Sequence, residues 1–138
     1  MHFVHLGIHT EFSITESIVR IPDLVKAAAN DEMPALALTD LSNLHAAVKF
    51  YKKCLDKGIK PILGSEIRLN DAEHRVTLLS MTNKGWRNLT ELVSEGYISG
   101  QQLDIPCVQK DWILNQHDDM IVLLGMQSDV GKMLITSN

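Results

Sequence analysis

The chain of 138 residues is long enough for one hydrophobic core, and 45% hydrophobic with 22% charged residues is an ordinary globular composition. Its 13 basic and 17 acidic residues give a formal charge of −4, so the chain lacks the excess of cations with which proteins bind phosphate backbones. The chain has two isolated cysteines, no secretory leader and no apolar run of about 20 residues. These features predict a single cytoplasmic domain with no membrane partner.

Strands and helices are expected to alternate from the first residues onward. Residues 3–6 predict a short strand that leads into a polar loop containing His9. Pro22 stands where a first helical turn accepts proline, and the apolar period behind it predicts a helix at 21–30. A strand at 33–38 follows.

The stretch from Ala35 to Leu44 organises the first half of the chain, because an apolar run turns there into polar residues and then into a helical period. The expected helix spans residues 43–57, ends at Gly58 and is followed by a strand at 61–64 that continues irregularly to Leu69. Its expected apolar face consists of Leu44, Val48, Tyr51 and Leu55. Such a strand, helix and strand predict a right-handed βαβ unit with its functional side chains at the carboxyl ends of the strands.

The second half breaks the alternation with a hairpin. Residues 75–79 form the next predicted strand, antiparallel to the one before because the connection is too short for a crossover. Further expected elements are a helix from residue 85 that Gly96 and Gly100 interrupt, an irregular stretch at 101–106, a helix at 109–114, a strand at 120–124 and a helix at 130–135. The pattern predicts an α/β layer or a barrel, and four or five strands are too few to close a barrel of eight.

Imidazole and carboxylate groups lie near several predicted strand ends. These residues are His5, His9, Asp40, Glu66 and His74. If the strand ends converge, the groups fit a site for divalent ions. The alternative is that they are hydrogen-bonded polar residues at loop starts, and Asp40 also suits a helix N-cap. No catalytic serine triad, P-loop, GxGxxG or zinc-finger spacing is present.

Several separated motifs together resemble one family. They are residues 3–13 (FVHLGIHTEFS), 21–26 (IPDLVK), 33–40 (MPALALTD), 58–66 (GIKPILGSE), 85–89 (GWRNL) and 129–131 (DVG). In this order they look like the amino-terminal PHP (polymerase and histidinol phosphatase) domain of the bacterial DNA polymerase III alpha subunit. The resemblance implies an α/β fold that is part of a distorted (β/α)7 barrel, with mostly parallel strands and a hairpin around residues 61–80. Residues 1–138 would then be about half of that barrel.

The resemblance also places the family's metal ligands. Remnants of that site fall on His9, Glu16, Asp40 and Glu66. A first histidine ligand falls on Gly7 and a second on Leu41, and neither residue has a side chain that binds metal. A later ligand position falls near Gly125 or Met126. These losses imply a vestigial site with no cofactor in this segment, whereas Mg²⁺ would serve a polymerase domain outside it.

The leading functional interpretation is a non-catalytic scaffold within a replicative DNA polymerase, a nucleotidyltransferase. The pattern resembles Gram-negative alpha subunits, in which a separate proofreading exonuclease (epsilon) subunit docks on the PHP domain. Partners implied by the resemblance are that subunit, other polymerase III subunits, and DNA through other domains. Two alternatives stay open: a metal-dependent phosphoesterase, in which ions activate water, and a free-standing PHP-like binding module.

Overall fold

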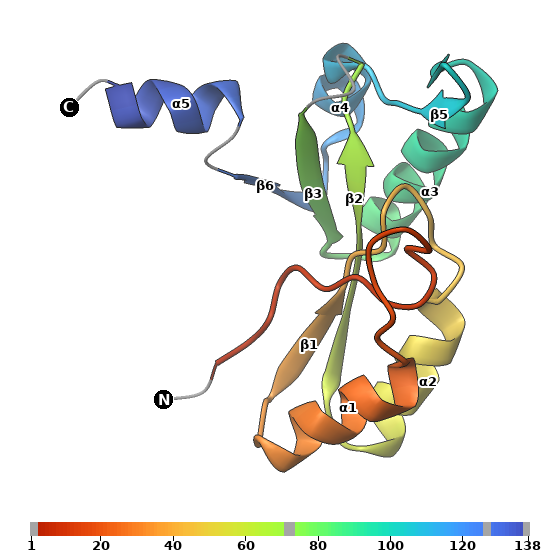
Figure 1. The fold of residues 1–138 in the computed structure, drawn as a ribbon, viewed down its shortest axis with the longest axis vertical. Helices are drawn as coiled ribbons and strands as arrows, with labels where there is room; N and C mark the ends of the chain where they lie inside the picture. The colour runs from red at the N-terminus through yellow and green to blue at the C-terminus, as the bar shows by residue number, and fades with distance from the viewer. Residues whose placement is uncertain (1–2, 71–73, 126–127, 137–138) are drawn as a thin grey trace.

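The computed structural model describes residues 3–70, 74–125 and 128–136, and it alternates helices with strands (Figure 1). The helices are α1 (Ile21–Asn30), α2 (Ala47–Asp56), α3 (Asn83–Ile98), α4 (Lys110–Gln116) and α5 (Asp129–Thr136). The strands are β1 (Ala35–Leu38), β2 (Lys60–Arg68), β3 (Arg75–Ser80), β4 (Gln101–Gln102), β5 (Ile105–Pro106) and β6 (Met120–Leu124). None of the helices in these ranges is long and apolar enough to cross a lipid bilayer.

One sheet with the strand order β1-β2-β3-β6 forms the frame. Strand β2 pairs in parallel with β1 and antiparallel with β3, which pairs antiparallel with β6. Three strands of this sheet therefore run in one direction and β3 opposes them, which confirms the expected mostly parallel α/β fold with a hairpin. Within the described residues the sheet is open, and β1 and β6 are its outer strands.

The expected first strand is wrong as a regular element, because residues 3–10 follow β1 without forming a ladder. The His5 carbonyl accepts from the Ala37 amide at 3.0 Å, and the Ile8 carbonyl accepts from the Thr39 amide at 2.9 Å. Between these two hydrogen bonds the segment advances by three residues, whereas the chain of β1 and the residue after it advances by two. This unequal spacing prevents regular strand pairing. The segment nevertheless brings His9, the residue after Ile8, to the carboxyl end of β1.

Both early helices end with a left-handed residue. After α2, Gly58 has a φ of 70°, and the Ile59 amide donates to the Cys54 carbonyl, which is the bonding pattern of a Schellman cap. After α1, the equivalent left-handed position is held by Glu32, with a φ of 52°. The bounds expected for α1 are confirmed, and so is the glycine at the end of α2.

The expected face of α2 is wrong. Val48, Tyr51 and Leu55 are exposed, whereas Ala47, Phe50 and Cys54 are buried. The helix also begins at Ala47 rather than at residue 43. Its start is delayed because the Asn43 side chain donates to the Phe12 and Leu41 carbonyls and accepts from the His45 amide, which stabilises a turn before the helix.

Helix α3 continues through Gly96, so the expected interruption there is wrong. The Thr82 side chain caps its start by accepting from the amides of Lys84 and Gly85. Gly96 lies against the Cys107 carbonyl, which a Cβ would approach to 3.3 Å. Close packing therefore accounts for this glycine. The stretch 101–106, expected to be irregular, forms the β4–β5 hairpin, and α4, β6 and α5 lie where helix, strand and helix were expected.

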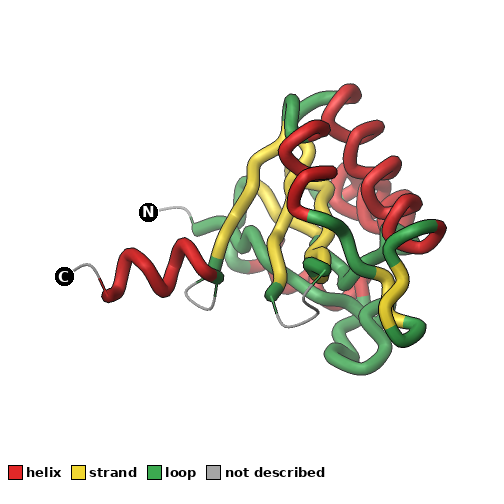
Figure 2. The backbone as a smooth tube through the Cα atoms, turned by 90° about the horizontal axis from the view of Figure 1, so that it is seen from above, coloured by secondary structure: helices red, strands yellow, loops and turns green. Residues whose placement is uncertain are grey.

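The buried apolar side chains of the described residues gather in two clusters. The first contains α1, β1 and α2 residues such as Leu36 and Phe50, and the second packs α3 residues such as Leu89 against β2 and β3. Because side chains alternate along a strand, Ile67 of β2 enters the second cluster while Glu66 and Arg68 lie on the opposite face. Most helices lie beside one face of the strands, and α5 extends away (Figure 2).

Candidate functional site

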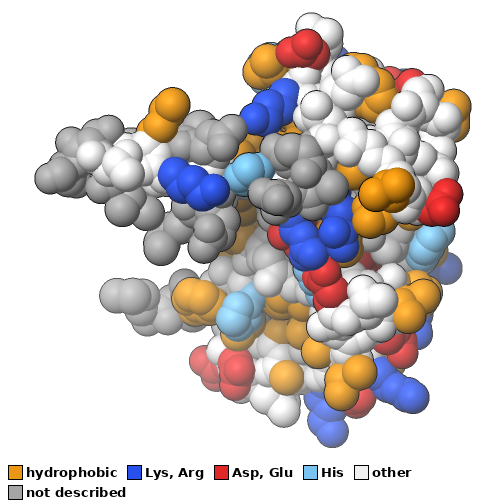
Figure 3. Space-filling view, turned by 45° about the horizontal axis from the view of Figure 1, so that its top comes forward, with side chains coloured by type: hydrophobic (Ala, Val, Ile, Leu, Met, Phe, Trp, Pro, Cys, Tyr) orange, Lys and Arg blue, Asp and Glu red, His pale blue; other side chains and the backbone are white. Residues whose placement is uncertain are grey.

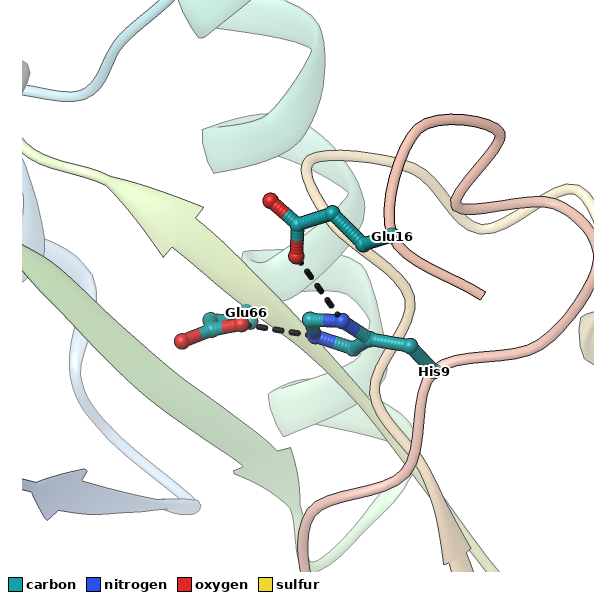
Figure 4. A group of neighbouring side chains, drawn as sticks. All are labelled: His9, Glu16 and Glu66. Atoms are coloured by element: carbon teal, nitrogen blue, oxygen red, sulfur yellow. Dashed lines mark ion pairs between the residues drawn. The ribbon is translucent and has the colours of Figure 1, made fainter. Parts of the chain in front are cut away.

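His9, Glu16 and Glu66 converge on the sheet face opposite α3, with one ligand atom of each within 4.8 Å of the others. His9 lies between the two carboxylates (Figure 4). Its Nδ1 is 3.1 Å from a Glu16 oxygen, and its Nε2 is 2.6 Å from a Glu66 oxygen. The three side chains are 21%, 24% and 23% exposed, so the cluster is open to solvent on one side.

Asp40 at the end of β1 fixes the loop that carries His9 and Glu16. Its Oδ1 accepts from the Thr10 amide at 2.6 Å and from the Ser13 hydroxyl at 2.7 Å, and its Oδ2 accepts from the Thr10 hydroxyl at 2.8 Å. Asp40 is only 1% exposed. The Ser17 hydroxyl donates to the His9 carbonyl at 2.8 Å and closes the same loop.

Glu66 is positioned by the backbone of β2. Its amide donates to the Asp40 carbonyl at 3.2 Å, and its own carbonyl accepts from the Ser42 amide at 2.7 Å. The buried Ser65 hydroxyl also donates to the Asp40 carbonyl, at 2.7 Å. The residues that follow β1 are thereby tied to the middle of β2, and this brings Glu66 under the loop that carries His9.

Two arginines complete the cluster. Arg68 and Arg75 stand directly opposite each other in the β2–β3 ladder, on the same face as Glu66. Arg75 donates two hydrogen bonds to Glu16, from Nη1 at 2.9 Å and from Nη2 at 2.6 Å, and its Nη1 is 3.6 Å from Glu66. Arg68 is 3.8 Å from Glu16. Like charges that face each other across a ladder are destabilising, and Glu16 offsets this repulsion by contacting both.

The pKa directions follow this geometry. The hydrogen bonds from Arg75, helped by the charges of Arg75, His9 and Arg68, hold the pKa of the Glu16 carboxyl below its usual value against the opposing effect of burial. The same hydrogen bonds to Glu16 raise the pKa of Arg75. Glu16 and Arg75 therefore stay charged together near neutral pH.

The structure brings together three of the four expected remnants and separates the fourth. Asp40 belongs to the loop contacts and not to the cluster of possible ligands. His5 is exposed and packs edge-on against Phe3, 4.7 Å between ring centroids. His74 lies outside the cluster, with its Nε2 3.5 Å from Lys132.

The two positions where ligands were expected to be lost lie beside the cluster. Leu41 pairs with Glu66 in an isolated bridge, and Gly7 lines the same hollow as His9 and Glu16. Of the later position, Gly125 directly follows β6 and has no side chain that could bind metal, and Met126 falls outside the described residues. Sequence reasoning missed Arg68 and Arg75, although the hairpin and the two-residue period of its strands could have placed both on the face of Glu66.

The cluster borders a hollow of about 420 Å³ lined by polar and small residues. The lining residues are Gly7, His9, Glu16, Ser17, Thr39, Glu66 and Thr77. Figure 3 shows basic side chains next to acidic ones near the middle of the molecular surface in that view. Chemically, the arrangement is a network of ion pairs in which each carboxylate already contacts a cation.

Comparison with known proteins identifies the family. The PHP domain model matches residues 5–138. The chain is 42% identical over 142 residues to the DNA polymerase III subunit alpha of Haemophilus influenzae, 42% over 139 residues to that of Pseudomonas aeruginosa and 38% over 142 residues to that of Escherichia coli K12. These alignments cover 99%, 96% and 99% of this chain, which spans 12% of the length of each relative.

Among solved structures, an amidohydrolase from Chromobacterium violaceum matches with a TM-score of 0.50 at 16% identity, over 67% of this chain and 34% of that one. This likeness concerns the fold alone. The family model, in contrast, runs from residue 5 to the last residue of the sequence, through every strand and helix described above. The chain therefore belongs to the PHP domain family.

Proposed function

We propose that this chain is the PHP segment of a DNA polymerase III alpha subunit and that it serves there as a scaffold without catalysis of its own. The observation that supports this is the identity of 38% to 42% to proteins of that name, which extends over nearly the whole chain. Nucleotidyl transfer, with its Mg²⁺, then belongs to other domains of the subunit.

The gene tests this identity directly. A reading frame that continues past Asn138 into polymerase domains supports the proposal. A stop codon immediately after Asn138 would instead support a free-standing PHP-like binding module.

The partner in this proposal is the proofreading exonuclease (epsilon) subunit of the same organism, as in the Gram-negative alpha subunits that the sequence resembles. Mixing the purified exonuclease with the full-length protein and measuring the mass of the complex by light scattering tests it. We expect one joint species, and an unrelated acidic protein of similar size in place of the exonuclease serves as the control. Two separate species at micromolar concentrations would refute the docking role.

A metal-dependent phosphoesterase is the second candidate, because His9, Glu16 and Glu66 are close enough to contact one ion. In such an enzyme the ion activates water and stabilises developing charge. The test is hydrolysis of an aryl phosphate with added Mn²⁺, in Glu66→Ala and in the control Glu91→Ala, which removes an exposed carboxylate of α3. Activity that only Glu66→Ala abolishes would overturn the non-catalytic role.

A further inference from the structure

We propose that the guanidinium of Arg75 takes the place that a divalent ion has in metal-binding PHP domains, so that an internal cation holds this site together and excludes metal. The inference rests on side-chain geometry in the site, and it holds whether or not the protein binds an exonuclease. It assigns a role to a residue on β3 that is not among the metal-ligand positions named above.

The contacts of Arg75 are those expected of a bridging cation. Its two terminal nitrogens donate to both oxygens of Glu16, at 2.9 and 2.6 Å. One of the same nitrogens is 3.6 Å from Glu66, so the guanidinium spans the two carboxylates that an ion would bridge. This forked arrangement is the geometry in which arginine binds carboxylates most strongly.

Even without the His9 ring, the charges of the site balance in the absence of an ion. Glu16 and Glu66 supply two negative charges, and Arg75 with Arg68 supplies two positive ones. A divalent ion at His9, Glu16 and Glu66 would lie beside a fixed guanidinium and would have to displace it from Glu16. The repulsion between the two cations, added to the loss of the forked pair, opposes metal binding.

The ligand supply also falls short. Mg²⁺ takes about six ligands in octahedral geometry and keeps several waters, and hard divalent ions favour carboxylate, carbonyl and water oxygens. Among the described residues, the only group of three or more possible metal ligands is His9, Glu16 and Glu66. At Gly7 nothing lies within 4 Å of where a Cβ would stand, and Leu41 offers only hydrocarbon. The residues present do not fit a site for several ions.

The test compares two substitutions of Arg75 in the full-length protein, with Mn²⁺ alone as the probe. Arg75→Gln removes the cation and keeps a polar side chain, whereas Arg75→Lys keeps the charge and loses the fork. The control is Arg20→Gln, which causes the same change in net charge at an exposed arginine that is 3.9 Å from the Glu11 carboxylate. Bound metal is measured per chain after dialysis, and the melting temperature is measured with and without Mn²⁺.

We expect Arg75→Gln to bind one Mn²⁺ per chain and to melt several degrees higher with Mn²⁺ than without it. The unaltered protein, Arg75→Lys and Arg20→Gln should bind less than a tenth of an ion per chain, with unchanged melting. If Arg75→Gln folds poorly, Mn²⁺ should restore its circular dichroism, and failure to do so counts against the inference.

Two results would overturn the inference. One is a stoichiometric ion in the unaltered protein that Glu66→Gln removes, because the ion and Arg75 would then coexist. The other is an Arg75→Gln protein that gains no metal and keeps the same melting behaviour as Arg20→Gln. Neither result bears on the exonuclease measurement, so the two proposals fail separately.

Discussion

Replacing Asp40 should destabilise the fold far more than replacing any exposed carboxylate. Asp40→Ala removes the acceptor of three short hydrogen bonds, from the Thr10 amide, the Thr10 hydroxyl and the Ser13 hydroxyl. Asp40, Thr10 and Ser13 are 1%, 0% and 4% exposed, so bulk solvent does not reach these donors in the folded protein. A hydrogen bond to a charged group contributes about 1.5–3 kcal/mol, and a buried donor left without an acceptor costs about 1–3 kcal/mol, so Asp40→Ala should cost about 3 kcal/mol or more.

Asp40→Asn should cost less, about 1–2 kcal/mol, because the amide oxygen can still accept from the Thr10 amide and the Ser13 hydroxyl. The Thr10 hydroxyl can rotate and accept from the new amide group. The assay is urea unfolding followed by circular dichroism, with free energies extrapolated to water.

Asp56→Ala serves as the control, since Asp56 is exposed at the end of α2 and its removal should change the free energy of unfolding by less than about 0.5 kcal/mol. A loss below about 1 kcal/mol for Asp40→Ala would refute the reasoning, because the three bonds would then carry little net energy. Equal losses for Asn and Ala would also refute it, since the Asn oxygen would then contribute nothing.

Three further outcomes are expected. Glu32→Gly should raise the free energy of unfolding, measured in urea, by about 0.5–1 kcal/mol, because glycine adopts the left-handed φ of 52° at the end of α1 without strain. Part of the gain is lost because glycine also makes the unfolded chain more flexible. A decrease in the free energy of unfolding would show that Glu32 is not strained. Burial raises the pKa of the Cys54 thiol to about 11, so iodoacetamide at pH 8 should label it only after unfolding, and mass spectrometry would detect labelling of the folded protein. The lowered pKa of Glu16 stabilises the folded state above the unfolded pKa of 4.5, and this stabilisation is lost as the pH falls through the folded pKa. Below pH 4.5 the melting temperature should therefore drop more steeply in the unaltered protein than in Glu16→Gln. Parallel curves of melting temperature against pH would contradict this.

The helices show where sequence patterns were sufficient and where they failed. Pro22 and a single apolar period defined α1, and both of its ends were predicted correctly. In α2 two apolar stripes compete for the core. The stripe that contains Val48 and Tyr51 is exposed, and the stripe that contains Phe50 is buried. Periodicity does not distinguish the stripes; the positions of α1 and β1, against which Phe50 packs, decide between them.

The site was predictable only in part, for a similar reason. The resemblance located His9, Glu16 and Glu66, which do converge. It could not show that Thr10 and Ser13 surround Asp40, because those contacts depend on how the loop folds. The resemblance also gave no sign of Arg75. Ligand motifs indicate which side chains bind an ion, and they do not indicate which side chain could take the place of the ion.

The long strand β2 belongs to both hydrophobic clusters, and this affects how the molecule opens. Leu63 packs against the first cluster and Ile67 lies within the second, so the strand is the main covalent and hydrogen-bonded link between two halves that could otherwise unfold locally and independently. Glu16 and Arg75 are 59 residues apart, one anchored in each half. Their pair adds a side-chain link between the two halves, so amide exchange in the two halves should be less coupled in an Arg75→Gln protein than in the unaltered protein.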